Sequence, residues 1–119
     1  MNRTQNPIQL NFLEVFNMNY FENLGIELPS IEEADSQRNP LAIAHFSNGE
    51  WDWFIIGGKE LPNGDFYLYG LVNGYEKELG MFTLHQIQDV GAFLDESFQA
   101  IGVFDIYDDF DLRGVLSGL

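Results

Sequence analysis

Two Asn-Gly pairs, each flanked by strand-forming residues, limit the folds open to this chain more than any other feature. Asn48-Gly49 lies within residues 41–56, and Asn73-Gly74 lies within residues 65–82. Asn-Gly is favoured in two-residue type I′ hairpin loops, because both loop positions need a positive φ. The sequence therefore predicts two consecutive β-hairpins, and four strands joined in this way form an antiparallel meander.

A two-residue loop at Asn73-Gly74 pairs Val72 with Tyr75 and assigns each neighbouring side chain to a face, because side chains alternate along a strand. The predicted core face carries Phe66, Leu68, Val72, Tyr75, Leu79 and Met81. The other face mixes aromatic rings with carboxylates and carries Tyr67, Tyr69, Leu71, Glu76 and Glu78. Such a face is typical of a half-solvated antiparallel sheet, and it also suits a protein contact surface. The candidate partner-binding residues on it are Tyr67, Tyr69, Glu76 and Glu78.

The Asn48-Gly49 loop pairs Phe46 with Trp51 and places His45 opposite Asp52. A histidine beside a carboxylate can act as an acid–base pair in catalysis. It is more often a cross-strand contact assisted by charge. We favour the cross-strand contact and name no catalytic residue.

Capping patterns predict three helices. The first spans residues 11–24 and ends at Gly25. Ser30 and Glu33 form a capping-box pattern for a short helical turn, and a third helix is predicted over residues 83–90. With the four-stranded meander, these flanking helices predict a single α+β domain that comprises all 119 residues.

The charge balance of the chain limits its partners. Nineteen Asp and Glu residues stand against five Lys and Arg residues, which gives a formal net charge of −14. Direct binding to nucleic acid or to an anionic membrane is not expected, because both need basic residues. A basic partner is permitted, including one that itself binds nucleic acid. The alternative is that the acidity only keeps the protein in solution.

The chain lacks the residues that mark several other classes of protein. It has no cysteine, which excludes disulfides and thiolate metal sites. It has no signal-peptide pattern and no apolar run of the roughly 18 residues that a membrane helix needs. It also has no G-x-S-x-G or H-E-x-x-H motif. A soluble cytoplasmic protein without a cofactor or metal is expected.

Acidic residues are densest near the C-terminus, where they alternate with aromatic residues. The members of this cluster are Asp105, Tyr107, Asp108, Asp109, Phe110 and Asp111. The segment lacks the glycine and the glutamate of an EF-hand. A weak Ca²⁺ or Mg²⁺ site stays an alternative to the solvated turn that we favour. Because acidic side chains attract a basic surface and aromatic rings anchor in it, these six residues are also candidate partner-binding residues.

Several short motifs resemble the domain-of-unknown-function family 2958, a set of small bacterial proteins often found on plasmids and other mobile elements. The motifs are Leu28-Pro29, NPLAIAHF at 39–46, WDWF at 51–54 and YGLVNGYEKELGMFTLHQI at 69–87. The resemblance implies a similar fold and a mobile-element origin, and it implies no active site. The predicted helix over 11–24 and the acidic segment after residue 100 depart from the family pattern.

These observations lead to one hypothesis and two alternatives. The hypothesis is a non-enzymatic acidic binding protein of a phage or mobile element. Such a protein imitates the charge of nucleic acid and inhibits a basic, nucleic-acid-binding defence protein of the host, as anti-CRISPR and anti-restriction proteins do. One alternative is an enzyme that uses carboxylates of the sheet face, with His45 nearby. The other is an acidic accessory subunit of a plasmid system. The oligomeric state is not predicted.

Overall fold

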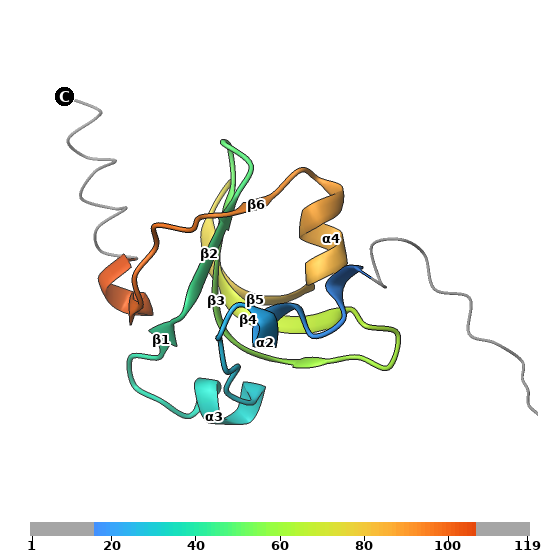
Figure 1. The fold of residues 1–119 in the computed structure, drawn as a ribbon. Coiled ribbons are helices and arrows are strands. Elements are labelled where there is room, and N and C mark those ends of the chain that lie inside the picture. Colours follow the sequence, from blue (N-terminus) through green and yellow to red (C-terminus); the bar gives the residue numbers. More distant parts are fainter. Residues whose placement is uncertain (1–15, 107–119) are drawn as a thin grey trace, which may run out of the picture.

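The structure is a computed structural model that describes residues 16–106. Its main element is a five-stranded antiparallel sheet in the order β5-β4-β3-β2-β6 (Figure 1). The strands of this sheet are β2 (Ala44–Ser47), β3 (Asp52–Glu60), β4 (Phe66–Asn73), β5 (Lys77–Thr83) and β6 (Phe93–Leu94). A second, two-stranded sheet consists of β1 (Leu41–Ala42) and β7 (Ile101–Gly102). The short helices are α2 (Tyr20–Asn23), α3 (Ile31–Asp35) and α4 (Leu84–Asp89).

The central strand β3 is buried on both faces, because other elements cover both sides of the sheet. Trp53 and Ile55 pack into a core on the side of α2 and α4. Phe54 and Ile56 pack into a second core on the side of α3, β1 and the helical turn of residues 103–106 (Figure 1). A strand that is covered on both faces consists of a continuous apolar run instead of an alternating one.

The predicted four-stranded meander is wrong as a description of the sheet. β2, β3, β4 and β5 follow one another as antiparallel neighbours, but β6 adds a fifth strand beside β2, and β1 and β7 form a separate sheet. β6 pairs through Phe46↔Leu94 and Ser47↔Phe93. A strand of two residues leaves no alternating pattern in the sequence, so only its backbone partner identifies it. The fold is mostly β, with short flanking helices.

The predicted register of the β4–β5 hairpin is wrong by three residues. Leu68 pairs with Phe82, and the loop consists of residues 74–76. An odd shift moves every side chain of β5 to the opposite face. Phe82 therefore takes a core position, where it is 8% exposed, and its ring buries a large apolar area. The residues displaced from the predicted core face are Tyr75, Leu79 and Met81, which are 94%, 39% and 41% exposed.

The β2–β3 hairpin is closed by residues 48–51, so its register differs from the predicted one by two residues. Phe46 pairs with Trp53, and an even shift leaves each side chain on its predicted face. Asn48 stabilises the longer loop, because its Oδ1 atom accepts hydrogen bonds from two loop backbone N–H groups at 3.0 and 2.8 Å. Gly49 has a φ of 93°. It is the one residue of this loop with a positive φ, whereas a type I′ loop needs two.

Both of the later helix starts are confirmed. Ser30 and Glu33 form a capping box at α3, and Thr83 forms one with Gln86 at α4. The helix predicted over residues 11–24 is wrong in its described part, because Asn19 has a φ of 61° and interrupts it before α2. Its start, before residue 16, lies outside the described residues. Between residues 16 and 106, no helix is both long and apolar enough to cross a membrane.

Candidate functional site

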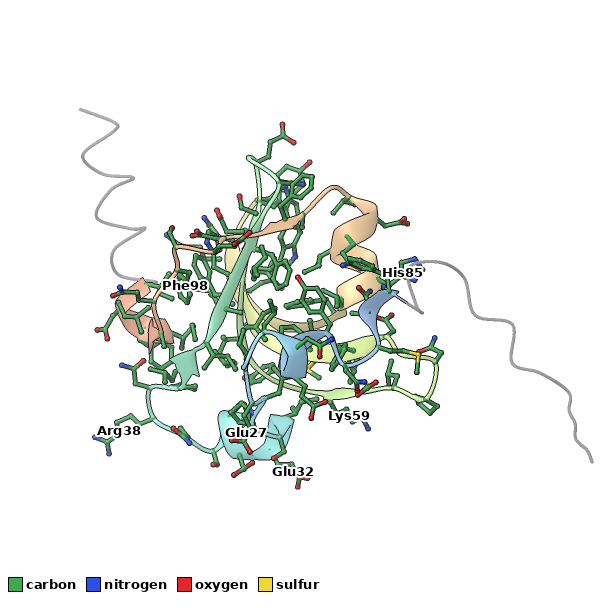
Figure 2. All side chains as sticks on the ribbon, in the orientation of Figure 1. Glu27, Glu32, Arg38, Lys59, His85 and Phe98 are labelled. Carbon is green, nitrogen blue, oxygen red and sulfur yellow. The ribbon has the colours of Figure 1, made fainter. Side chains whose placement is uncertain are left out.

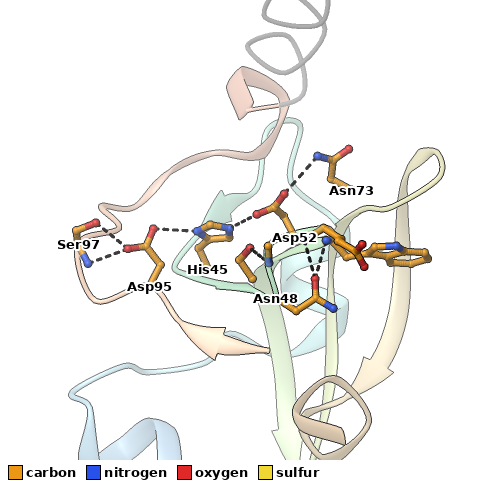
Figure 3. A network of polar contacts seen from close by, with 10 residues as sticks. His45, Asn48, Asp52, Asn73, Asp95 and Ser97 are labelled. Carbon is orange, nitrogen blue, oxygen red and sulfur yellow. Dashed lines mark hydrogen bonds and ion pairs between the residues drawn. The ribbon is translucent and has the colours of Figure 1, made fainter. Parts of the chain in front are cut away.

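His45 lies between two aspartates on the side of the sheet opposite α4 (Figure 3). Its Nε2 atom is 2.7 Å from Asp52 Oδ1, and its Nδ1 atom is 2.9 Å from Asp95 Oδ2. Both distances are those of hydrogen bonds, so the ring is held through both of its nitrogens. Asn73 Nδ2 lies 3.5 Å from the second oxygen of Asp52. The predicted contact of His45 with Asp52 is confirmed, although the residue directly across the strands is Phe54.

This His45 network joins β2, β3 and the segment that follows β6. Ser97 donates to Asp95 Oδ1 through its backbone N–H at 3.0 Å and through its hydroxyl at 2.7 Å. The His45 ring stacks on Phe54 with the ring centroids 4.3 Å apart. Neither ring nitrogen is free to take a proton from a substrate. The arrangement is therefore suited to holding these three segments together.

Asp95 should make the stability of the fold depend on pH. Hydrogen bonds from Ser97, followed by the bond from His45, lower the pKa of Asp95 from 3.8 to about 2. A carboxyl whose pKa is lower in the folded chain than in the unfolded chain stabilises the fold when it is ionised. This contribution should be complete above about pH 5 and lost as the pH falls through about 2. Urea unfolding at a series of pH values measures the loss.

The Asp95→Asn variant isolates this contribution, because an asparagine side chain at position 95 does not titrate. Its free energy of unfolding should decrease less between about pH 4 and about pH 2 than that of the unchanged protein. Glu96→Gln is the matched control, since Glu96 is the exposed neighbour of Asp95. The control should keep the full decrease. The same decrease in Asp95→Asn and in the unchanged protein would contradict the expectation.

A groove with an aromatic ridge lies at the loop end of the two hairpins. Trp51 forms the ridge, and its ring centroid is 6.1 Å from that of Trp53 and 5.3 Å from that of Tyr75. A cavity of about 380 Å³ opens on each side of Trp51, and the two cavities together are named the Trp51 groove. The cavity toward α4 is lined by Asn48, Glu50, Trp51, Trp53, Phe82, Gln86, Ile87 and Val90. The cavity toward β5 is lined by Trp51, Val72, Tyr75, Glu76, Glu78, Gly80 and Met81.

Three exposed glutamates stand at the rim of the Trp51 groove. Glu50 lines the cavity toward α4, and Glu76 and Glu78 line the cavity toward β5. Lys77 lies between the last two in the sequence, but it pairs with Asn73 and so belongs to the opposite face of the sheet. The rim is therefore negative, while the walls are aromatic. Such a groove favours a ligand that combines positive charge with apolar or planar surface.

The structure does not place the predicted partner-binding residues of the β4–β5 hairpin on one face. Tyr67 and Tyr69 belong to the β4 face on the side of the His45 network, whereas Glu78, which pairs with Val72, belongs to the α4 side. The shift of three residues in the hairpin register causes this separation. Of the predicted residues between 16 and 106, Glu76 and Glu78 meet at the rim of the Trp51 groove.

Two other predicted residues have partners inside the chain. The Tyr69 hydroxyl donates to Asp35 Oδ1 at 2.7 Å. Burial is the larger cause and this hydrogen bond the next of the raised pKa of Tyr69. Asp105 Oδ2 accepts from Asn39 Nδ2 at 3.4 Å. The members of the acidic cluster outside the described residues are Tyr107, Asp108, Asp109, Phe110 and Asp111. The His, Asp and Glu side chains of residues 16–106 form no group that could hold a metal ion.

The Trp51 groove was not predicted from the sequence, although the sequence contains a signal for it. The two-residue loops assigned Trp51 to a strand and Tyr75 to the core. In a meander, however, the first and third turns lie at the same end of the sheet. Trp51 and Tyr75 each lie within two residues of an Asn-Gly pair, so the meander alone brings their rings to one end.

No family model matches this sequence, and no curated protein or solved structure matches it significantly. The resemblance to family 2958 therefore stays a prediction from short motifs.

Proposed function

We propose that this protein is a non-enzymatic acidic binding protein whose partner is a basic protein surface of the kind that binds nucleic acid. By covering this surface, the protein would prevent the partner from binding nucleic acid, as an anti-CRISPR or anti-restriction inhibitor of a mobile element does. It would meet its partner in the cytoplasm. The observation that carries the proposal is the Trp51 groove, where aromatic walls stand beneath three exposed glutamates.

The described part of the chain carries most of the negative charge. Of the nineteen acidic residues, Glu14, Asp108, Asp109 and Asp111 lie outside residues 16–106, and of the five basic residues, Arg3 and Arg113 lie outside. Fifteen acidic residues and three basic residues remain. Glu32 and the basic Arg38 both point outward from the end of the molecule where α3 lies (Figure 2). Most carboxylates in this segment nevertheless have no Lys or Arg to neutralise them. The resulting excess of negative charge attracts a basic partner over a long range.

The Trp51 groove adds a place where an attracted partner can be held. Trp and Tyr are enriched among the few residues that contribute most of the binding energy at protein interfaces. Tyr75 is 94% exposed, so its ring contributes little buried area to the fold. The adjacent cavities offer concave apolar surface, and the glutamates select for positive charge at the rim. Charge and shape thus favour the same partner.

The enzyme alternative uses carboxylates of the sheet face with His45 nearby, and the His45 network does not support a catalytic role for His45. Both ring nitrogens contact carboxylates, and the ring stacks on Phe54. A general base needs a nitrogen within reach of the proton that it removes. We therefore assign function to the Trp51 groove and a structural role to the His45 network.

Displacement of DNA from a basic peptide tests the proposal. The probe is a fluorescent DNA duplex bound to a peptide rich in arginine and glycine. The protein should take the peptide from the DNA at about 50 mM salt and lose most of this activity at about 500 mM, because salt screens the attraction. The variant Glu50→Gln/Glu76→Gln/Glu78→Gln should be weaker by at least about fivefold. Fluorescence anisotropy measures the released DNA.

The matched control removes the same charge from elsewhere. Glu22→Gln/Glu27→Gln/Glu32→Gln changes three exposed glutamates that do not line the Trp51 groove. It should weaken displacement by no more than about twofold. If both triple variants lose the same amount of DNA-displacing activity, the Trp51 groove is not the binding site for the basic partner. A protein that releases no DNA at low salt, or that is indifferent to salt, would contradict the proposed function.

A further inference from the structure

We infer that the cavity of the Trp51 groove toward β5 is a subsite for one arginine side chain of the partner. The inference rests on the proposed function, because it names the group by which a basic partner is held. Trp51 and Tyr75 form two walls of this cavity, with their rings at 79° to each other. Val72 and Gly80, on the neighbouring strands β4 and β5, form its floor, and Glu78 lies at its rim.

The chemistry of this cavity fits a guanidinium group better than an ammonium group. A guanidinium is planar, so it can stack on an aromatic face while its N–H groups donate in parallel to a carboxylate. Trp51 and Tyr75 supply the aromatic surface, and Glu76 and Glu78 supply the carboxylates. The ammonium group of lysine is compact and strongly hydrated, so it gains less from a flat wall. The cavity should therefore distinguish arginine from lysine at equal charge.

The Trp51 wall is already in place without a ligand. A Cβ atom added to Gly74 would be 2.5 Å from two carbon atoms of the Trp51 ring. The indole thus lies against the β4–β5 loop at a distance that only glycine permits. The backbone N–H of Trp51 also donates to Asn48 Oδ1 at 2.8 Å. A wall that is ordered before binding avoids the entropy cost of ordering it during binding.

Gly80 keeps the floor of the cavity free. A Cβ atom added there would meet no other heavy atom within 4 Å. Gly80 and Glu78 are two residues apart on β5, so a side chain at position 80 would point to the same face as Glu78. Gly80→Val should fill the cavity without a clash and should keep the fold. It removes the subsite while the net charge stays unchanged.

The experiment is an NMR titration with two peptides of about eight residues, identical except that two arginines in one are lysines in the other. The Trp51→Leu variant identifies the indole N–H signal of Trp51. The arginine peptide should shift this signal and bind at least about fivefold more tightly than the lysine peptide. Gly80→Val and Tyr75→Ala should each weaken its binding by at least about fivefold. Phe93→Ala removes another exposed ring, 77% exposed and outside the Trp51 groove, and should leave affinity unchanged.

The outcomes separate the subsite from the proposed function. Equal affinity for the two peptides overturns the arginine subsite. Binding of the arginine peptide that neither Gly80→Val nor Tyr75→Ala weakens also overturns it. In both cases the proposed function stands if binding still depends on salt. If neither peptide binds at low salt, the proposed function fails together with the subsite. Thermal unfolding of each variant verifies that a loss of binding is not a loss of folding.

Discussion

Gly70→Ala should lower the free energy of unfolding by at least about 3 kcal/mol or prevent folding altogether. Gly70 pairs with Ile55, next to the bulge where the register between β3 and β4 shifts. A Cβ atom at this position would overlap the backbone carbonyl oxygen of Phe54. A backbone atom cannot rotate away as a side chain can, so β3 and β4 would have to separate. Urea unfolding followed by circular dichroism measures the effect.

Gly80→Ala is the matched control, because Gly80 is the cross-strand partner of Gly70 in the β4–β5 ladder. The chemical change is the same, but a Cβ atom at Gly80 meets open space. Its free energy of unfolding should stay the same or rise by up to about 1 kcal/mol, because alanine restricts the unfolded chain. If the two variants unfold at the same urea concentration, Gly70 does not lie as close to β3 as the structure places it.

His45→Ala should lower the free energy of unfolding by about 2–4 kcal/mol near neutral pH. The substitution removes the ring that contacts Asp52 and Asp95, and it leaves two carboxylates close together with no imidazole between them. The His45 side chain is only 15% exposed, so water replaces the lost contacts incompletely. Phe54 also loses its stacking partner. Urea unfolding at pH 7 measures this loss as well.

Two further variants show whether the loss comes from the His45 network. His85→Ala removes the other histidine, at a partly exposed position of α4, and should change the free energy of unfolding by no more than about 0.5 kcal/mol. Asp52→Asn and Asp95→Asn, added to His45→Ala, should recover part of the loss because they remove the repulsion. A stability of His45→Ala equal to that of His85→Ala would mean that the network does not hold the fold.

The parts of the fold that were predicted correctly depend on residues close together in the sequence. The starts of α3 and α4 each depend on two residues three positions apart, and both capping boxes form. The two hairpins exist for the same reason, since each contains an Asn-Gly pair between strand-forming runs. The contact of His45 with Asp52 was also predicted, because an even shift in register keeps both side chains on one face.

The tertiary structure decided the loop lengths and hence the surface. At Asn73-Gly74 the local preference for a two-residue turn is outweighed by the burial of Phe82, and the resulting register exposes Tyr75. This single shift separated the predicted aromatic–acidic face and created the Trp51 groove.

Local sequence is enough to specify the antiparallel hairpins, the two capped helices and the excess of negative charge, because each depends on composition or on neighbouring residues. Long-range packing is needed to add β6 to the sheet, to bring Asp95 to His45 across fifty positions, and to bring Trp51 to Tyr75. These contacts join distant segments, and their partners are selected by which apolar side chains the whole chain can bury at once. Local patterns do not contain that information.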